Sequence, residues 1–291
     1  MSKSPNQHYY MQTVLKDRLK FMNMAQKLLL NALNLQIKPV LNKVDVHHGP
    51  TDHLIKTDAL KDAFKKIYTD VGSHFAKAQY DSLMMGKKKS KNSLSKKSMR
   101  FKDDDEDDDD EPTMTGPHST LLQSTDEAMD EDEFDNEWRK TISDYIDSDG
   151  AEMITNITDS TKNYIKEYIS EAIKNGTSAA ELASDMRDHF ADFNRSRSML
   201  IARTEIARAQ NFATNEGAKM TGLELTKTWL HAGNSPNDRD DHADADGQEV
   251  DFDDTFDINS DYAPSYPHDG SGGADEEANC NCTFFTSRKK D

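Results

Sequence analysis

Hydrophobic residues recur at three- and four-residue steps through most of the first 220 positions. One stripe runs through residues 9–38 and a second through residues 52–85, with Thr51 or Asp52 as the candidate cap of the second. This spacing is typical of amphipathic helices, and Pro39 is expected to end the first one. The two stripes therefore predict a helical hairpin that packs or oligomerises. The first stripe comprises Leu15, Leu19, Met22, Ala25, Leu29 and Leu33, and the second comprises Leu60, Phe64, Ile67, Val71, Phe75 and Ala78.

The helical pattern returns from Phe134 onward. It predicts a helix beginning near Phe134, a second over 154–175 and a third after Ser178. The pair Asn175–Gly176 suits the left-handed end of a helix, and Ser178 with Glu181 has the spacing of a capping box. A fourth helix is expected from Asn194 to about Met220, with small residues along one side that permit close packing.

The periodicity changes after Gly222. Residues 223–230 alternate and predict a strand, residues 233–235 predict a turn, and residues 282–286 predict a closing strand. We therefore predict an α+β protein, mainly helical, with a small loop-rich α+β module at its end. Its expected parts are a helical region 1–85, a linker 86–133, a helical arm 134–221 and the module 222–291.

Charge is distributed unevenly along the chain. The formal net charge is −18, and the hydrophobic content is 34% against a typical ~45–50%. Eight basic residues lie between Lys87 and Lys102, and nine acidic residues run without interruption from Asp103 to Glu111. Blocks of like charge bury too little apolar surface to offset chain entropy, so residues 86–133 are expected to be disordered. The adjoining acidic block competes with DNA for the lysines, which favours neutralisation within the chain.

Cysteine content and hydropathy indicate the cellular compartment in which the protein is expected. The chain has two cysteines, Cys280 and Cys282, which do not make a disulfide framework. No stretch approaches the ~18 apolar residues of a membrane span, and no signal-peptide pattern begins the chain. We expect a protein made and used in a cytoplasm, with reduced thiols and no membrane association.

The last quarter of the chain carries the candidate chemistry. Its histidines and cysteines supply a candidate Cys2His2 zinc site, because zinc prefers imidazole and thiolate ligands in a tetrahedral array. These residues are His242, His268, Cys280 and Cys282. The alternative is structural: His242 and Asp246 pin loops by hydrogen bonds, and the cysteines pack as small apolar residues.

Two other chemistries compete for the same residues. The run from His242 to Gly247 has the oxygen-rich rhythm of a calcium loop, but His242 stands where an EF-hand begins with Asp. The catalytic alternative is an acid–base pair of His231 or His242 with Asp238, Asp246 or Glu205, or a nucleophilic pair of Cys280 with His242. Neither pair carries a family-specific local motif, so we assign no catalytic residue and expect no enzyme.

The helix over 194–220 carries charges of two kinds. Arg197, Arg203 and Arg208 lie in its first half together with Glu205. They indicate either a solvated face with helical charge pairs or, for Arg203 and Glu205, buried anchors of the module that follows.

Taken in order, these features resemble the phage Mu F-like minor head protein family, also called phage head morphogenesis proteins. The resemblance covers about residues 154–285, while residues 1–153 show no family signature. It rests on Asn175–Gly176–Thr177–Ser178, Arg197, Ala202–Arg203–Thr204–Glu205, Asn211, Lys227, Trp229, Asp238–Arg239, His242, Asp246–Gly247, Phe256, Pro267–His268–Asp269 and Asn279–Cys280 with Cys282. The chain departs from the family at Asn281, where arginine is common, and at Asp240–Asp241.

The resemblance implies a minor structural protein of a tailed-phage head. Such a protein is expected in the head interior or at the portal vertex of the virion, assembled in the host cytoplasm, with the portal protein or the major capsid protein as partner and weak contact with packaged DNA. The first alternative is a DNA-associated protein ejected with the genome, whose contacts are Lys87–Lys102 and Arg288–Lys290. The second alternative is a metal-dependent hydrolase or nuclease.

Overall fold

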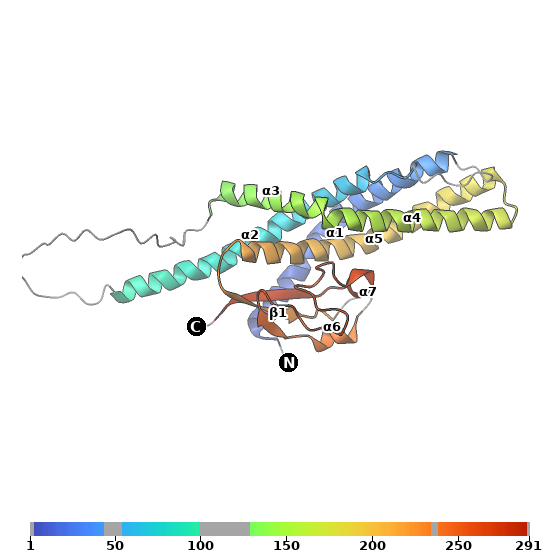
Figure 1. Ribbon diagram of the computed structural model, residues 1–291. Coiled ribbons are helices and arrows are strands. Elements are labelled where there is room, and N and C mark those ends of the chain that lie inside the picture. The colour runs from blue at the N-terminus through green and yellow to red at the C-terminus, as the bar shows by residue number, and fades with distance from the viewer. Residues whose placement is uncertain (1–2, 44–53, 99–128, 234–237, 290–291) are drawn as a thin grey trace, which may run out of the picture.

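The computed structural model describes residues 3–43, 54–98, 129–233 and 238–289. Long helices come first along the chain, and a small sheet with two short helices follows (Figure 1). The long helices are α1 (Pro5–Lys43), α2 (Asp58–Ser98), α3 (Glu131–Asp147), α4 (Asp149–Lys174) and α5 (Ala179–Lys219). The module contains β1 (Leu225–Leu230), α6 (Asp240–Asp244), β2 (Glu249–Asp251), α7 (Gly273–Glu277) and β3 (Thr283–Arg288).

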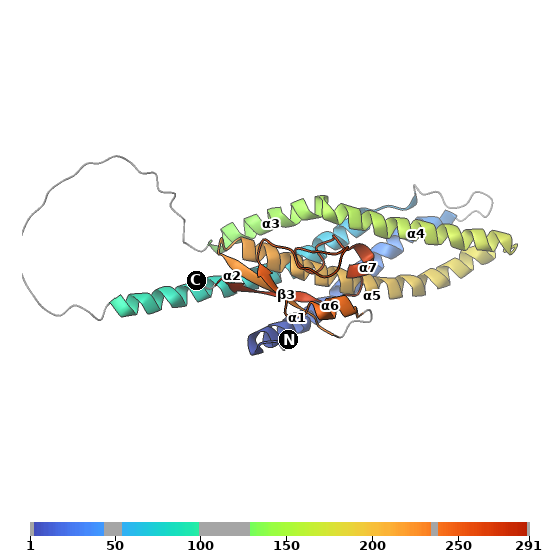
Figure 2. The same ribbon diagram turned by 60° about the horizontal axis from the view of Figure 1, so that its bottom comes forward.

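The helices form an elongated body with one shared core. Residues from α1, α2, α3 and α5 pack into the largest hydrophobic cluster, which includes Leu29, Phe64, Trp138 and Ile206. Figures 1 and 2 show α5 running along the body beside α1 and α2. The N-terminal helices therefore share their core with the helices of residues 134–221, although the sequence placed them in separate parts.

A second cluster closes the far end of the body. There the last turns of α1 pack against α4 and the start of α5 through Ile37, Val40, Ile165 and Leu182. The expectation that Pro39 ends the first helix is wrong, because α1 continues through Pro39 to Lys43. A proline inside a helix costs about 3 kcal/mol, and burial of Ile37 and Val40 on either side of it offsets that cost.

A single helix, α5, replaces the two helices expected over residues 178–220. It begins at the predicted capping box, where the Ser178 hydroxyl and the Glu181 carboxylate each accept from the other residue's backbone N–H. Asn194, at the expected boundary, is buried, and its amide donates to the Asn34 side chain of α1 at 2.9 Å. Because this amide bonds across to another helix, it does not compete with the backbone of α5.

The expected disordered linker is shorter at both ends than residues 86–133. Helix α2 runs past residue 85 to Ser98, and α3 begins at Glu131 behind the N-cap Asp130. Methionine and lysine are good helix formers, so the helix propagates from the packed part of α2 into the basic block. The remaining part of the expected linker, residues 99–128, lies outside the described residues.

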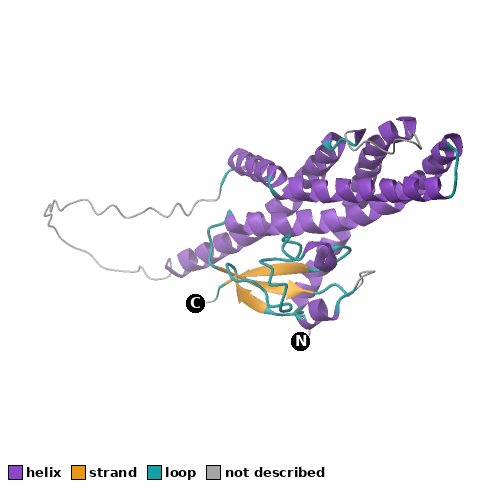
Figure 3. Ribbon diagram, turned by 45° about the vertical axis from the view of Figure 1, so that its right-hand side comes forward, coloured by secondary structure: helices purple, strands orange, loops and turns teal. Residues whose placement is uncertain are grey.

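The module is built on an antiparallel sheet with strand order β2-β1-β3 (Figure 3). Trp229 pairs with Phe284, and Thr228 lies between Glu249 and Phe285. The strands predicted over 223–230 and 282–286 are β1 and β3, whereas the short β2 was not predicted. The predicted α+β class, mainly helical with a small C-terminal sheet, is confirmed. No helix in the described residues is long and apolar enough to cross a membrane.

Candidate functional site

The central strand β1 delivers Trp229 and His231 to the middle of the module. The Trp229 indole donates to the backbone carbonyl of His242 at 3.1 Å, and its own carbonyl accepts from Gly247 at 2.9 Å. Gly247 adopts a positive φ of 86°, which favours glycine. The Asp246 carboxylate accepts from the backbone N–H of His231 at 2.8 Å. The Asp246–Gly247 turn therefore holds the end of β1 against the loop that carries His242.

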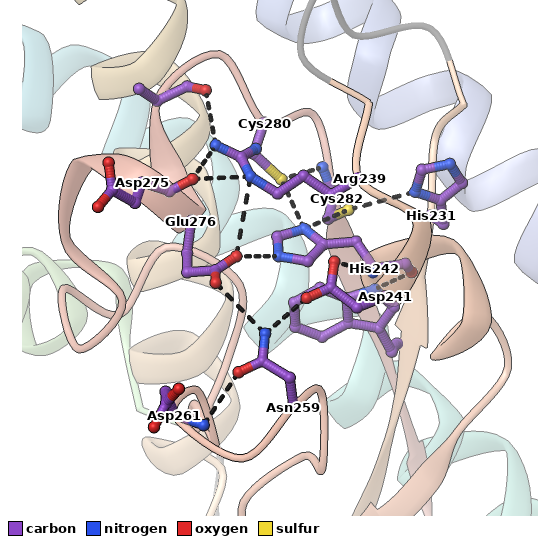
Figure 4. Close-up of polar contacts among 12 residues, drawn as sticks. His231, Arg239, Asp241, His242, Asn259, Asp261, Asp275, Glu276, Cys280 and Cys282 are labelled. Atoms are coloured by element: carbon purple, nitrogen blue, oxygen red, sulfur yellow. Dashed lines mark hydrogen bonds and ion pairs between the residues drawn. The ribbon is translucent and has the colours of Figure 1, made fainter.

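Two cysteines and two histidines meet beside this turn (Figure 4). His242 Nδ1 lies 3.5 Å from Cys280 Sγ and 3.7 Å from Cys282 Sγ. The ligand atoms of these three buried residues all lie within 4.8 Å of one another. His231 adjoins the group at its edge, with Nδ1 3.6 Å from Cys282 Sγ. These side chains come from β1, α6 and the residues before β3, so the fold gathers ligands that are far apart in the sequence.

Carboxylates orient both histidines from the outside. Nε2 of His242 lies 3.2 Å from Glu276 Oε2, and Nε2 of His231 lies 3.2 Å from Asp238 Oδ1. Each imidazole thus turns Nε2 to an acid and Nδ1 to sulfur. Figure 4 shows the arrangement for His242, between Glu276 and the cysteines. Hydrogen bonds of this kind fix the ring orientation and the tautomer.

The acids beside His242 are held by an amide. Asp241, His242 and Glu276 form a second close group of potential ligands. The Asn259 amide nitrogen, however, lies 2.5 Å from Asp241 Oδ2 and 3.3 Å from Glu276 Oε1. A neutral amide donor therefore bridges these carboxylates, which supports their role as positioning groups for the His242 ring.

The two thiols and His242 shift one another's pKa values. A hydrogen bond from Cys282 and the nearby imidazoles of His268 and His242 hold the pKa of Cys280 well below its usual range, against the effect of burial. The pKa of Cys282 is raised by that same hydrogen bond and by burial. Burial opposes ionisation of His242, but the hydrogen bond to Cys280 and its charge raise the His242 pKa. The three shifts share one cause, the close contact of the two sulfurs and the His242 ring.

His268 does not join the group that contains the other three predicted zinc ligands. Its Nε2 lies 3.0 Å from the carbonyl oxygen of Cys280, and it is buried with a positive φ of 66°. The structure thus brings together three of the four expected ligands, His242, Cys280 and Cys282, and places His268 outside the group. His268 contacts the backbone of the cysteine segment, and His231 stands closer to the sulfur of Cys282.

Asp238 and Arg239, adjacent in the sequence, make two separate contacts. Asp238 contacts His231, as described above, while Arg239 reaches the short helix α7. Its Nε donates to the carbonyl of Asp275 at 2.8 Å, and its Nη2 lies 3.4 Å from the carbonyl of Ala278. Cations complement the exposed carbonyls at the C-terminal end of a helix. Arg239 therefore fixes the segment that delivers Glu276 to His242.

The backbone of the cysteine segment is fastened to the helical body. Arg18 of α1 donates to the carbonyls of Asn281 at 3.0 Å and Cys282 at 3.2 Å. Asn211 of α5 also donates to the Cys282 carbonyl, at 3.1 Å. Arg18 is buried, and this burial lowers its pKa to about 10. The first helix, which the sequence left without a role, therefore helps to position the two sulfurs.

A buried ion-pair network joins α5 to α7. Arg208 Nη1 lies 2.6 Å from Glu205, and Nη2 lies 2.7 Å from Glu277. Tyr68 of α2 donates to Glu205 at 3.0 Å. Desolvation opposes the charge of Arg208, but the two carboxylates raise its pKa well above the usual range. Of the two expected anchors, Glu205 is buried and Arg203 is exposed; Arg208 is the arginine that holds the module.

Lys227 is a buried cation under the sheet. Its ammonium donates to the carbonyl of Ser265 at 2.7 Å and lies 5.6 Å and 5.4 Å from the ring centres of Phe252 and Phe256. Desolvation lowers the pKa of Lys227 to about 8, although nearby aspartates oppose the shift. The lysine thus ties the loop that precedes His268 to the central strand.

The calcium and enzyme alternatives meet specific obstacles. Residues 240–244 form the helix α6, and the Asp246 carboxylate already accepts from His231 and from Lys3 at 2.6 Å. The catalytic pair Cys280 and His242 does form, but both side chains are buried around a cavity of about 10 Å³. A cavity of that size holds about one water molecule.

Sequence reasoning missed several residues that the fold recruits. Asp241, Asn259 and Glu276 support His242, and Arg18 supports the cysteine segment. A signal existed for His231, which follows Trp229 by two positions at the end of a predicted strand. Acidic residues are common throughout the module, so nothing in the sequence separates Glu276 from its neighbours.

Comparison with known protein families gives a match in the C-terminal part of the chain. Residues 163–285 match the family model described as "Phage Mu protein F like protein". This match confirms the resemblance indicated by the sequence. The matched segment begins within α4 and ends in β3, so it contains α5, the cysteines and all the histidines of the module.

Two curated relatives share part of the chain. The "Uncharacterized protein YqbB" of Bacillus subtilis (strain 168) is 29% identical over 126 residues, which cover 43% of this chain and 41% of the relative. The "NAD(+)--arginine ADP-ribosyltransferase EFV" of Enterococcus faecalis (strain ATCC 700802 / V583) is 35% identical over 111 residues, which cover 37% of this chain and 22% of the relative. The chain therefore spans less than half the length of either relative. No solved structure matches.

Proposed function

Residues 163–285 are a Phage Mu F-like region, which connects the protein with phage head morphogenesis, and we propose that it is a minor structural component of a tailed-phage head. In this proposal the protein docks at the portal or the inner capsid during head assembly. The partner is the portal protein or the major capsid protein, and the protein becomes part of the virion.

The observation that carries the proposal is the rigid joint inside the matched region. Arg208 of α5 bonds to Glu277 of α7 in a buried setting, and Asn211 of α5 bonds to the Cys282 carbonyl. Thr283 adds a hydrogen bond to the Asn211 side chain at 2.9 Å. Buried polar contacts of this kind fix one relative arrangement of two parts. A rod-like helical body with a firmly attached module suits a protein that bridges components of a shell.

The part of the chain outside the match reinforces the same joint. Arg18 of α1 contacts the cysteine segment, and Gln79 of α2 donates to Thr286 of β3. Tyr10 of α1 packs edge-on against Phe285, with 5.3 Å between ring centres. The N-terminal helices therefore support the module, which favours a structural task for the whole body.

The DNA-associated alternative retains one of its two basic segments. Arg288 donates to the carbonyl of Leu83, and Lys289 pairs with Asp251 at 2.8 Å, so both already contact the protein. Lys290 lies outside the described residues. The block 87–102 begins within the backbone of α2, and residues 99–102 lie outside the described residues. This block remains the segment with which an ejected, DNA-bound protein would contact phosphates.

The test is co-expression of the full chain with the portal protein of the same phage, followed by purification at low and high salt. A structural docking protein is expected to remain with the portal at high salt, because burial of apolar surface does not depend on counterion release. The same experiment with the major capsid protein identifies the alternative partner. Loss of both complexes at every salt concentration contradicts the proposal.

DNA binding is measured in parallel on the full chain and on a chain that lacks residues 87–102. Contacts between lysines and phosphates lose affinity steeply as salt rises. If the intact chain binds duplex DNA in a salt-sensitive way and the deletion abolishes binding, the DNA-associated function is supported. An unchanged affinity in the deletion variant removes that alternative.

A further inference from the structure

We propose that the module binds one structural zinc ion through two imidazoles and two thiolates. The ligands are His231, His242, Cys280 and Cys282. This inference goes beyond the head function proposed above, because that function stands or fails on partner binding and this one on metal content. It also changes the ligand set suggested by the sequence, in which His268 took the place of His231.

The distances match those of a tetrahedral zinc centre. Zinc lies about 2.3 Å from thiolate sulfur and about 2.1 Å from imidazole nitrogen, so a tetrahedral angle places sulfur and nitrogen ligands about 3.6 Å apart. The three nitrogen–sulfur distances here are 3.5 Å, 3.7 Å and 3.6 Å. A hydrogen-bonded cluster of thiols and imidazoles gives distances of this order as well, so metal content is the measurement that separates the two.

A small cavity lies at the centre of these ligands. It measures about 10 Å³ and is lined by both cysteines, His231 and His242, with Asp238 and Arg239 at its border. The space suits a single ion or water. His268 does not line this cavity, and its Nε2 already faces the carbonyl of Cys280. The cavity is the observation that favours His231 over His268 as the fourth ligand.

The surroundings of the ligands are those of a metal site. Glu276 and Asp238 face the Nε2 atoms of His242 and His231, which leaves both Nδ1 atoms directed at the sulfurs. Carboxylates that orient ligating histidines in this way are a regular feature of zinc sites. The sulfur of Cys280 also accepts from the backbone N–H of Cys282 at 3.3 Å. Such N–H contacts stabilise the thiolate form that zinc requires.

The geometry points to a structural ion. His242, Cys280 and Cys282 form a close buried group of three ligands, and His231, whose Nδ1 lies 3.6 Å from Cys282 Sγ, adjoins it as the fourth. Four protein ligands without an open position for water or substrate are the pattern of structural zinc sites. The ligands come from the end of β1, from α6 and from the segment before β3, which acidic loops separate. A zinc ion bound there ties the three segments together.

The first experiment measures metal content in the purified full chain. We expect about one zinc ion per chain, and none above background in the Cys280→Ser/Cys282→Ser variant. Replacement by cobalt is expected to give the visible absorption of a tetrahedral site with thiolate ligands, and the same variant must lack it. If the intact chain contains no zinc and takes up neither zinc nor cobalt, the proposal is overturned.

The second experiment separates His231 from His268 with matched variants. Glutamine places its amide nitrogen near the position of Nε2 and removes Nδ1, so each variant keeps the outer hydrogen bond of its histidine. We expect His231→Gln to lower the affinity for zinc at least about tenfold, measured in competition with a chelator. We expect His268→Gln to keep the affinity of the intact chain. The reverse order overturns the assignment of His231.

A third variant covers the case in which either histidine is needed for folding. The Asp238 side chain is 49% exposed, so Asp238→Asn is expected to fold normally. If His231 is a ligand, loss of the Asp238 carboxylate lowers the affinity for zinc about 10- to 100-fold. A matched change at another exposed acid of the module, Asp261→Asn, is expected to leave the affinity unchanged. Equal affinities in the two asparagine variants count against His231.

Discussion

Arg208 of α5 and Glu277 of α7 form a buried ion pair with 2.7 Å between Nη2 and Oε2, although 69 positions separate them in the sequence. Glu277 also accepts from the backbone N–H of Gly270 at 2.7 Å, and Arg208 also bonds to Glu205. One guanidinium thus pairs with two carboxylates where the module meets the helical body. Such an ion pair favours one specific arrangement of the two parts. A buried ion pair adds little stability compared with apolar residues in its place, but removal of one partner destabilises the fold strongly.

The first prediction concerns this pair. Arg208→Met leaves Glu205 and Glu277 buried without their cation, so we expect a loss of about 3–5 kcal/mol in the free energy of unfolding. Urea denaturation followed by circular dichroism measures it. The matched control is Arg195→Met on the same helix, whose pair with Asp192 is exposed and is expected to contribute less than about 1 kcal/mol. Equal losses in the two variants would show that the network does not hold the module.

The second prediction concerns a close approach between α2 and α5. A Cβ atom added at Gly217 would collide with the backbone carbonyl of Ala76. Backbone cannot move aside as a side chain can, so Gly217→Ala is expected to force the helices apart and to destabilise the protein by about 1–3 kcal/mol. Thermal unfolding of the full chain measures the loss.

The control for this substitution is Gly150→Ala in α4. There the added Cβ meets the end of the Ile146 side chain at 3.2 Å, which can shift by a few tenths of an ångström. Alanine is also favoured over glycine inside a helix by about 1 kcal/mol, so this variant is expected to be neutral or slightly stabilising. A Gly217→Ala protein as stable as the control would contradict the close packing described for α2 and α5.

Local features of the fold could be predicted from the sequence because their causes are local. The capping box at Ser178 and the strand predicted over 223–230 each depend on residues a few positions apart, and both appear in the structure. The predicted helix end at Pro39 was wrong because the energetic cost of a proline depends on its own helix, whereas the packing that offsets this cost involves other helices. Burial of Ile37 and Val40 against α4 and α5 cannot be read from the periodicity of α1.

The candidate site shows the same division. Cys280, Cys282 and His242 could be selected because they suit one metal and the chain has only two cysteines. Asp238 could be selected from the resemblance, whereas Glu276 could not, because it is one of fifteen acidic residues between His231 and Ser287. Arg18 lies 264 positions from Cys282, and only packing of α1 against α5 brings it there. The choice between His231 and His268 likewise depends on loop geometry, which the spacing of residues does not encode.

The third prediction concerns pH and Lys227. Its pKa is about 8 in the folded protein and about 10.4 in an unfolded chain. Between these values the unfolded state binds more protons, so this group makes the free energy of unfolding rise as pH increases from about 8 to about 10.4. The difference between these two pKa values corresponds to about 3 kcal/mol, and the destabilising effect of the buried charge is fully present below pH 8.

The measurement for Lys227 is the difference in stability between the intact chain and Lys227→Met across this pH range. Methionine fills similar space without a charge, so the variant lacks this component of the pH dependence. The difference is expected to shift in favour of the intact chain as pH rises from 8 to 10.4. Titration of the two thiols occurs in both proteins and largely cancels in the comparison. Parallel curves would show that Lys227 keeps an ordinary pKa in the folded state.

The fourth prediction uses the two tryptophans to locate the effect of metal removal. Trp229 lies in the module, bonded to the His242 carbonyl, and Trp138 lies in the helical body, bonded to Ser73 at 2.9 Å. In Trp138→Phe the emission comes from Trp229 alone, and in Trp229→Phe it comes from Trp138 alone. A strong chelator is expected to shift the Trp229 emission to longer wavelength as the loop around His242 opens to water, while the Trp138 emission stays unchanged.

The same treatment should lower the thermal midpoint of the intact chain. A ligand that binds only the folded state contributes about 4 kcal/mol when its free concentration is about a thousandfold above its Kd, and chelation removes that contribution. Zinc added back must restore both the midpoint and the Trp229 emission, and the Cys280→Ser/Cys282→Ser variant must respond to neither treatment. If the two tryptophans shift together, the ion stabilises the whole body and not the module alone, because unfolding then spreads through the joint formed by Arg208 and Arg18.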